Sequence, residues 1–264
     1  MKIAPYTGDM DSFDYLSLLV VDLQGALRSV SLPRAYVSEK VLADGIGFDA
    51  SNFSFAQVHS SDMTAVPDLS SAFLEERGEF RVLHAFCDVR SAEGTPFPQY
   101  PRVVVRKAEE YLRTTGIGEE ALMLVELEFY VFEDVRYHTT VDKSYYFVES
   151  AEGLGEEHED RGRFGLSKGY HRMGPDEKYG LLRDRAVRTM LEAGIPVKYH
   201  HHEVGASQME IELDFMNLSR AADGVVLAKW ILKSTADELG LKVTFMPKPM
   251  YKIAGSGMHV HQYV

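Results

Sequence analysis

Acidic and imidazole side chains gather in three short stretches of this 264-residue chain, and the first stretch is a pair of glutamates. Glu126 and Glu128 lie two residues apart within an apolar run, residues 122–133. In a β-strand this spacing places both side chains on one face. Neighbouring carboxylates repel each other, and burying them is costly unless a cation lies between them. The pair therefore predicts a solvent-facing strand edge or, if that face is buried, a metal site.

The second stretch combines histidine with glutamate. Three histidines at positions 200–202 precede Glu203, and Glu210 and Glu212 follow. In a strand, His201 and Glu203 share one face, while the first and third histidines point to the other. A single histidine is commonly a packed or surface residue, but a run of three before a glutamate is harder to explain by packing. We interpret this stretch as a candidate ligand group, with Glu212 as a structural residue.

The third stretch runs from Gly255 to His261. Its glycines let the backbone approach a ligand closely, and His259 and His261 point to one side if the segment is extended. A His-x-His pair also occurs in ordinary surface strands and in zinc hydrolases, so a zinc hydrolase is one alternative. The sequence has no His-Glu-x-x-His motif and no cysteine pair. Ligands dominated by glutamate favour Mg2+ or Mn2+ over zinc.

The overall charge limits the classes of partner. The chain has 40 acidic residues against 28 basic ones, which gives a formal net charge of −12 at pH 7. An acidic chain repels phosphate backbones and anionic lipid, so we expect no nucleic acid and no membrane as partners. ATP is not excluded, because a bound divalent cation reverses the local field.

Cysteine usage and hydropathy favour a cytoplasmic protein. The single cysteine, Cys87, cannot form an internal disulfide or a thiolate zinc site, which favours a reducing compartment. The first residues lack the apolar region of a signal peptide. The apolar stretches are also shorter than the ~18 residues that a membrane helix needs.

The elements that must position these motifs differ between the two halves of the chain. The first half reads mostly as strands: a hairpin over residues 15–32, then an irregular, exposed segment over 44–68, then a strand over 81–88. A cluster of prolines between Ser91 and Pro101 predicts a domain boundary near residue 99.

The second half alternates helix and strand. We predict helices from Pro101 to Gly116, from Pro175 to Gly194, and from an N-cap at Ser219 to Gly240. We predict strands over residues 122–133 and 197–215, a charged loop over 152–163 and a proline-broken loop over 245–249. The three chemical motifs then fall on separate strands of one domain.

The same three stretches resemble a known family. Residues 125–129 (Val-Glu-Leu-Glu-Phe) are similar to the Glu-x-Glu-Phe signature of glutamine synthetases. Residues 201–204 (His-His-Glu-Val) with 208–210 (Gln-Met-Glu) resemble the family's His-His-Glu-Val…Gln-x-Glu segment. Residues 248–249 (Lys-Pro) with 255–259 (Gly-Ser-Gly-Met-His) resemble a third segment.

Short segments of the N-terminal half appear in the family's order too, so the resemblance runs from about residue 20 to the end. These segments are Phe48-Asp49, Ser61-Asp62-Met63, Pro67-Asp68 and Phe86-Cys87-Asp88-Val89. The resemblance implies an α+β fold. A small β-grasp-like domain over residues 1–99 would precede an incomplete catalytic domain over 100–264, with a mainly antiparallel curved sheet and flanking helices. It also implies a ring-forming homo-oligomer with sites between subunits.

The resemblance implies metal ligands at the predicted strands. Glu128, Glu203 and Glu210 would hold one Mg2+ or Mn2+ ion. Glu126 and His259 would hold a second ion, together with a glutamate outside this chain.

The resemblance also implies substrate contacts. Gly255 would contact glutamate, His261 the nucleotide phosphates and Phe215 the adenine side of ATP. Asp49 would bind and deprotonate ammonium across a subunit contact. ATP would phosphorylate the γ-carboxylate of glutamate, because oxide is too poor a leaving group, and ammonia would then displace phosphate.

Some positions depart from the family's pattern. Ala254 stands where the family usually has the Asn that helps to hold glutamate. Residues 49–52 read Asp-Ala-Ser-Asn instead of Asp-Gly-Ser-Ser, residues 168–171 read Lys-Gly-Tyr-His instead of Lys-Gly-Gly-Tyr, and Tyr263 replaces a common Ser. One alternative is therefore a γ-glutamyl-polyamine ligase of the same superfamily.

The length suggests another alternative, a truncated and catalytically incompetent remnant. Glutamine synthetases continue well beyond 264 residues, so we expect negligible synthetase activity from this chain alone.

Overall fold

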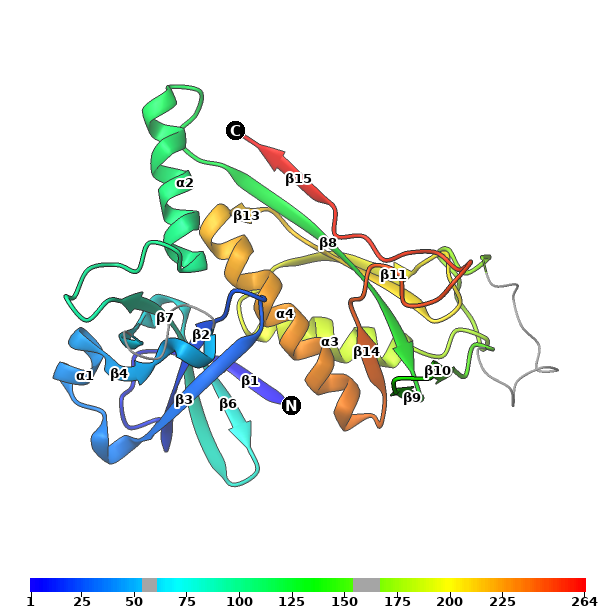
Figure 1. Ribbon diagram of the computed structural model, residues 1–264, viewed down its shortest axis with the longest axis horizontal. Coiled ribbons are helices and arrows are strands. Elements are labelled where there is room, and N and C mark those ends of the chain that lie inside the picture. Colours follow the sequence, from blue (N-terminus) through cyan, green and yellow to red (C-terminus); the bar gives the residue numbers. More distant parts are fainter. Residues whose placement is uncertain (54–60, 154–166) are drawn as a thin grey trace.

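The computed structural model describes residues 1–53, 61–153 and 167–264 and shows two β-sheets with helices packed between and beside them (Figure 1). This arrangement confirms the predicted α+β class. Most of the charged loop predicted over residues 152–163 lies outside the described residues. In the described part of the chain, no helix is both long and apolar enough to span a membrane.

The N-terminal sheet has the strand order β1-β6-β7-β2-β3, with β5 also paired to β7 and β4 to β5. Its strands are β1 (Lys2–Pro5), β2 (Tyr15–Val21), β3 (Leu27–Pro33), β4 (Ile46–Asp49), β5 (Asp62–Pro67), β6 (Phe73–Arg77) and β7 (Phe80–Arg90). Short helices connect them: η1 (Arg34–Tyr36), α1 (Glu39–Asp44), η2 (Ala50–Phe53) and η4 (Leu69–Ser71). β2 pairs with β7 in parallel, and the other pairs are antiparallel.

The predicted hairpin and the strand over residues 81–88 are confirmed as β2–β3 and β7. The prediction that residues 44–68 form an irregular segment is wrong, because β4 and β5 lie within this range. Its many Gly, Ser, Asn and Asp residues favour turns locally. Pairing of β5 with β7 and burial of Met63 and Ala65 override that preference.

The C-terminal sheet is built around β8 (Leu122–Phe132), the long green strand of Figure 1. The order is β11-β12-β8-β13, with β14 and β15 also paired to β8, and every pair is antiparallel. These strands are β11 (Val197–His202), β12 (Gln208–Leu213), β13 (Met216–Asn217), β14 (Lys242–Thr244) and β15 (Val260–Tyr263). A separate hairpin comprises β9 (Asp134–Thr139) and β10 (Ser144–Glu149).

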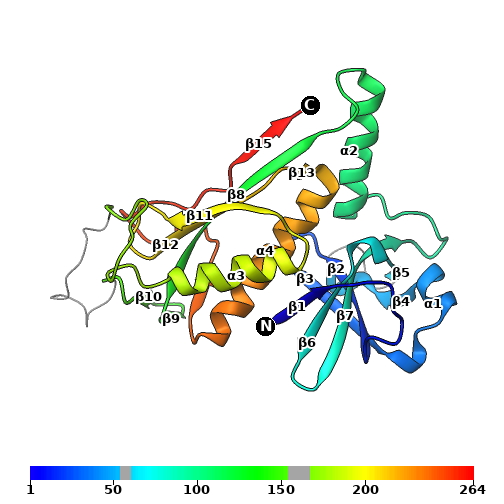
Figure 2. The same ribbon diagram turned by 180° about the vertical axis from the view of Figure 1, so that it is seen from behind.

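Helices α3 (Gly180–Glu192) and α4 (Leu218–Glu238) lie on one side of the C-terminal sheet, and α2 (Pro101–Thr115) packs beside α4 (Figure 2). The predicted helix from Pro101 to Gly116 is confirmed: Pro101 occupies its first turn, and Gly116 closes it with a left-handed φ of 69°.

The other predicted boundaries need correction. α3 begins at Gly180 and not at Pro175, because the Glu177 carboxylate accepts the Tyr179 N–H (2.8 Å) and shapes a turn before the helix. The N-cap of α4 is Asn217 and not Ser219; its side chain accepts the N–H of Arg220 (2.9 Å). The single strand predicted over residues 197–215 is divided into β11 and β12 by a turn, residues 203–207.

Alternation along the central strands decides which side chains reach the core. Leu127, Phe129, Met209 and Ile211 are fully or almost fully buried in the core that contains α3 and α4. Because successive strand residues face opposite ways, the glutamates between them must lie on the other face of the sheet. That face carries the candidate site.

One of the hydrophobic core clusters joins the two sheets. Ile3, Leu19 and Phe73 of the N-terminal sheet pack in the same cluster as Leu227 and Ile231 of α4. Burial of this continuous apolar surface joins the two halves of the chain. The division at residues 99 and 100 stays a prediction.

Candidate metal centre

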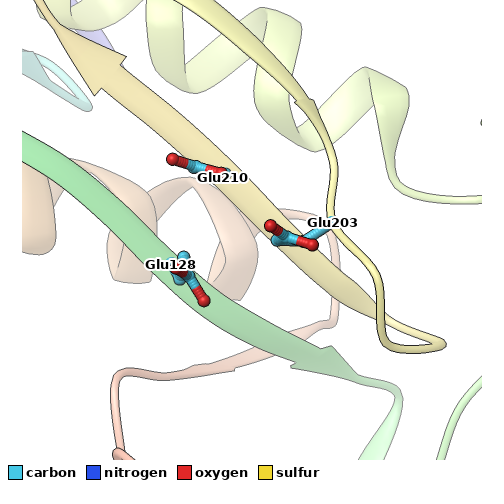
Figure 3. A group of neighbouring side chains, drawn as sticks. All are labelled: Glu128, Glu203 and Glu210. Carbon is cyan, nitrogen blue, oxygen red and sulfur yellow. The ribbon is translucent and has the colours of Figure 1, made fainter. Parts of the chain in front are cut away.

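Three carboxylates from separate segments converge on one face of the C-terminal sheet (Figure 3). Glu128 on β8 and Glu210 on β12 are directly paired across the sheet, and Glu203 comes from the turn after β11. One oxygen of each lies within 4.8 Å of the others. We call Glu128, Glu203 and Glu210 the three-carboxylate site. The side chains of Glu128 and Glu210 are each only 9% exposed, so the solvent-edge alternative does not hold for them.

Negative charge accumulates at the three-carboxylate site. Burial raises the pKa of Glu203, and repulsion from Glu128 and Glu210 raises it further against the opposing hydrogen bond from the Val204 N–H. Burial, nearby like charge and hydrogen bonding are the effects that shift carboxyl pKa values. A divalent cation fits this site, because clustered carboxylate oxygens are the ligands that Mg2+ and Mn2+ prefer.

His201 is an imidazole neighbour of this site. Its Nε2 lies 3.2 Å from Glu210 Oε2. Burial alone would lower the pKa of His201, but its contacts with Glu210 and with the His202 carbonyl outweigh burial and raise the pKa. When protonated, this imidazole offsets part of the negative charge at Glu210.

The loop before β15 is held against Glu128. The side-chain amide of Gln208 donates to Glu128 Oε2 (3.0 Å) and to the Gly255 carbonyl (2.8 Å). At Gly257 an added Cβ would lie 3.0 Å from Glu128 Oε1 and 2.9 Å from His259 Nε2. Glycine therefore permits the close approach of this loop to the carboxylate.

A second ligand group adjoins the first. His259 Nδ1 lies 2.6 Å from one oxygen of Glu126, and His261 Nε2 lies 2.8 Å from the other. The hydrogen bond to Glu126 raises the pKa of His259. Burial would raise the pKa of Glu126, but its bonds to His261 and His259 outweigh burial and lower it. His259 Nδ1 is also 3.8 Å from Glu128 Oε1, so the two groups are neighbours.

The structure thus brings all five predicted metal ligands onto one face: Glu126, Glu128, Glu203, Glu210 and His259. Two residues predicted to contact ATP lie nearby. His261 contacts Glu126, which the sequence did not predict. Phe215 is half-buried against Tyr263 of β15, with 4.9 Å between ring centroids. Gly255, predicted to contact glutamate, is exposed.

Asp49 lies apart from this group. It ends β4 of the N-terminal sheet and is exposed. Hydrogen bonds from the Ser51 N–H (2.9 Å), the Ser51 hydroxyl and Ser61 lower its pKa. Within one chain it belongs to the other sheet, so its predicted action across a subunit contact stays a prediction.

The sequence predicted no role for Gln208 or Glu152, and it placed His201 and His202 in a candidate ligand group without showing their contacts. Gln208 could have been found, because it lies two residues before Glu210 on the same strand and so shares its face. Glu152 could not, since it lies fifty residues from His202 along the chain.

The fold and the site define a class: an α+β protein whose antiparallel sheet carries a carboxylate-rich centre for divalent cations. Comparison with known families is more specific. The glutamine synthetase catalytic domain matches residues 98–264, and the glutamine synthetase beta-grasp domain matches residues 12–92. The chain belongs to the glutamine synthetase family, which confirms the resemblance and the β-grasp expectation.

Individual relatives agree. The chain is 36% identical to the glutamine synthetase of Mycolicibacterium smegmatis, over 96% of this chain and 55% of the relative, and 35% identical to that of Frankia alni, over 97% and 56%. The chain thus spans about half the length of the curated relatives it matches. The cryo-EM structure of Plasmodium falciparum glutamine synthetase matches with a TM-score of 0.91 and 25% identity, over 97% of this chain and 51% of that one. A GmaS–ADP complex shares the fold, with a TM-score of 0.74 and 23% identity over 95% and 53%.

Proposed function

We propose that this chain supplies the metal centre of an ATP-dependent ligase that joins ammonia to the γ-carboxylate of glutamate through γ-glutamyl phosphate. The convergence of Glu128, Glu203 and Glu210 within 4.8 Å is the observation that carries the proposal. Membership of the glutamine synthetase family supports the reaction class.

The residues fit two divalent cations. Glu128, Glu203 and Glu210 would hold one, and Glu126 with His259 would hold the other. Bound Mg2+ or Mn2+ would neutralise phosphate charge during phosphoryl transfer.

Residues other than the metal ligands would contact the substrates glutamate, ATP and ammonium. The exposed backbone at Gly255 is free of a side chain that would obstruct glutamate. His261 would approach the phosphates of ATP, and Phe215 would contact the adenine side of the nucleotide. Asp49, with its lowered pKa, remains ionised at neutral pH and suits binding of ammonium and acceptance of its proton.

The position of Asp49 supports an oligomer. It lies in the N-terminal sheet, outside the face that carries the carboxylates. A neighbouring copy that presents its Asp49 to this face would complete the site, so we propose a ring-forming homo-oligomer.

Metal binding tests the proposal directly. Titration of Mn2+ into the chain, with free ion followed by electron paramagnetic resonance, is expected to show a tightly bound ion that Glu210→Gln abolishes. The matched control is Glu149→Gln, which alters an acid of β10 paired with Arg136 at the surface. Absence of bound Mn2+ would contradict the proposal.

The reaction itself is tested on the protein isolated from its natural source. Phosphate release and glutamine formation are expected to require glutamate, ammonia and ATP together. ATP turnover without glutamine formation in the presence of ammonia would contradict ammonia as the acceptor.

Ala254 favours a second candidate, ligation of a larger amine such as a polyamine to glutamate. Its carbonyl accepts the Tyr130 hydroxyl (2.7 Å), but its methyl side chain offers no amide to a substrate. A panel of ammonia, methylamine and putrescine separates the two. Turnover that needs the diamine and is independent of ammonia would favour this second function.

A further inference from the structure

A fully buried acid–imidazole pair adjoins the three-carboxylate site. The side chains of Glu152 and His202 are both 0% exposed, and Glu152 Oε2 lies 2.8 Å from His202 Nε2. Glu152 follows the β9–β10 hairpin, and His202 is the last residue of β11. Neither residue belongs to the proposed ligands, but His202 immediately precedes Glu203.

Glu152 contacts both ends of the turn that carries Glu203. The oxygen that faces His202, before the turn, also accepts the N–H of Ser207 at its end (2.6 Å). The second oxygen accepts the N–H of Lys178 (2.9 Å). Ser207 has a left-handed φ of 66°, a conformation that is unfavourable for a residue with a Cβ atom. The buried carboxylate therefore stabilises the turn at its least favourable residue.

His202 extends this restraint to the backbone of Glu203. Its Nδ1 lies 2.6 Å from the Glu203 carbonyl oxygen. Because a carbonyl only accepts, Nδ1 is the donor. The N–H of Glu203 donates in turn to the Gln208 carbonyl (2.8 Å). Both peptide groups of Glu203 are thereby fixed, and its side chain is aimed at the other two carboxylates.

The ring of His202 has little freedom to move. The His171 N–H donates to the His202 carbonyl (2.9 Å). At Gly169 an added Cβ would lie 2.4 Å from the His202 ring and 2.5 Å from the Glu203 carbonyl oxygen. This close packing means that a shift of His202 must be transmitted to the turn.

We propose that Glu152 is a positioning residue for metal binding: through His202 and Ser207, its carboxylate fixes the turn that directs Glu203 into the three-carboxylate site. This inference rests on the proposed metal centre. It gives Glu152 a role in supporting that centre, although Glu152 lies fifty residues before His202 in the sequence. Partners that orient metal ligands without touching the metal commonly change affinity by 10–100-fold when substituted.

The experiment measures Mn2+ affinity in the 264-residue chain. Glu152→Gln keeps the size of the side chain but sets its amide NH2 against a backbone donor in either orientation, the N–H of Ser207 or the N–H of Lys178. The Mn2+ ion whose binding is lost in Glu210→Gln is taken as the ion at the three-carboxylate site. We expect Glu152→Gln to weaken that ion's binding about tenfold. Glu149→Gln, three residues earlier, should leave it unchanged.

A structural role and a positioning role give different results. An ion pair that only stabilised the fold would lower the unfolding temperature in EDTA and leave the affinity of the folded protein at the wild-type value, which would overturn the inference. If Glu152→Gln does not fold, Glu152→Asp replaces it. Its shorter side chain reaches one end of the turn, and wild-type Mn2+ affinity in this variant would also overturn the inference.

A further comparison keeps the two proposals distinguishable. If the wild-type chain binds no Mn2+, the proposed function fails with the inference. If the wild type binds Mn2+ and both Glu152 variants match it, only the positioning role fails. His202→Gln should weaken binding to a similar degree, and the double variant with Glu152→Gln should weaken it by less than the product of the two single effects, because the two substitutions share the Glu152–His202 contact.

Discussion

Buried acids occur in both sheets, but their partners differ. In the N-terminal sheet and its turns, basic side chains meet them: Asp22 lies 2.9 Å from Arg28, and Glu75 lies 2.8 Å from His84 and 2.6 Å from Arg77. In the three-carboxylate site, the acids face one another. The first region is balanced by the chain itself, whereas the second would be balanced by the cation that we propose it binds.

The pKa shifts of two glutamates, one in each sheet region, point in opposite directions. Burial raises the pKa at both Glu75 and Glu203. At Glu75, hydrogen bonds from His84 and Arg77 outweigh burial, and the pKa is lowered. At Glu203, Glu128 and Glu210 add to the effect of burial, and the pKa is raised. Charge balance thus separates acids that stabilise the fold from acids suited to bind a ligand.

Between the two sheets, Arg102 of α2 is the strongest case of internal balance. Its guanidinium contacts Asp68 (2.7 Å), Asp88 (3.0 Å) and Asp223 (3.1 Å), and its side chain is 11% exposed. Asp68 and Asp88 belong to the N-terminal half and Asp223 to α4, so one arginine joins the two halves.

The largest expected effect is loss of this arginine. Arg102→Met preserves the length of the side chain but leaves three acids without their shared cation. We expect the free energy of unfolding to fall by about 3–5 kcal/mol, as for other buried pairs deprived of one partner. Urea unfolding measures it. Arg106→Met is the control, because Arg106 is 42% exposed and pairs with Asp88 at the surface. Equal decreases in the free energy of unfolding in the two variants would contradict the idea that buried Arg102 balances the three acids.

The next effect belongs to the unbalanced region. If a cation completes the three-carboxylate site, Mn2+ should stabilise the folded chain. At free Mn2+ about a hundred times the dissociation constant, the expected gain is about 2.7 kcal/mol. Urea unfolding with Mn2+ and with EDTA measures it, and Glu210→Gln should remove most of the gain. Identical curves with and without Mn2+ would show that the site does not need a cation.

Local signals in the sequence predicted some elements well. Pro101 and Gly116 mark the ends of α2 because their backbone preferences act within a few residues. The spacing of Glu126 and Glu128 placed both on one face, since strand alternation is also local. The strand that bears Glu126 and Glu128 was therefore predictable.

Long-range contacts decided what the sequence could not show. β4 and β5 form because β7 pairs with β5, although their composition favours turns. The turn between β11 and β12 was missed because its left-handed residue is Ser207 and not glycine. The partnership of Glu152 with His202 depends on packing between distant segments, and no spacing rule encodes it.

The third prediction concerns Glu75 and acid. Because its folded-state pKa is below the ordinary 4.5, its stabilisation is present at neutral pH and is lost as the pH falls below 4.5 through the folded-state value. Glu75→Gln should lower the free energy of unfolding by about 2 kcal/mol at pH 7, through loss of hydrogen bonds between charged groups. Urea unfolding at several pH values should show wild type and variant converging in acid. A difference that stayed constant below pH 4.5 would contradict ionic pairing.

The smallest expected effect has the opposite sign. Glu203→Gln removes one negative charge from a group of three, so in EDTA the free energy of unfolding should rise by about 1 kcal/mol while Mn2+ binding is lost. Urea unfolding at pH 7 measures this free energy for Glu203→Gln and, in parallel, for Glu75→Gln. The same substitution, glutamate to glutamine, would then destabilise one sheet and stabilise the other. If both substitutions destabilised the metal-free chain equally, the carboxylates of the second sheet would already be balanced by the protein, and the need for an external cation would disappear.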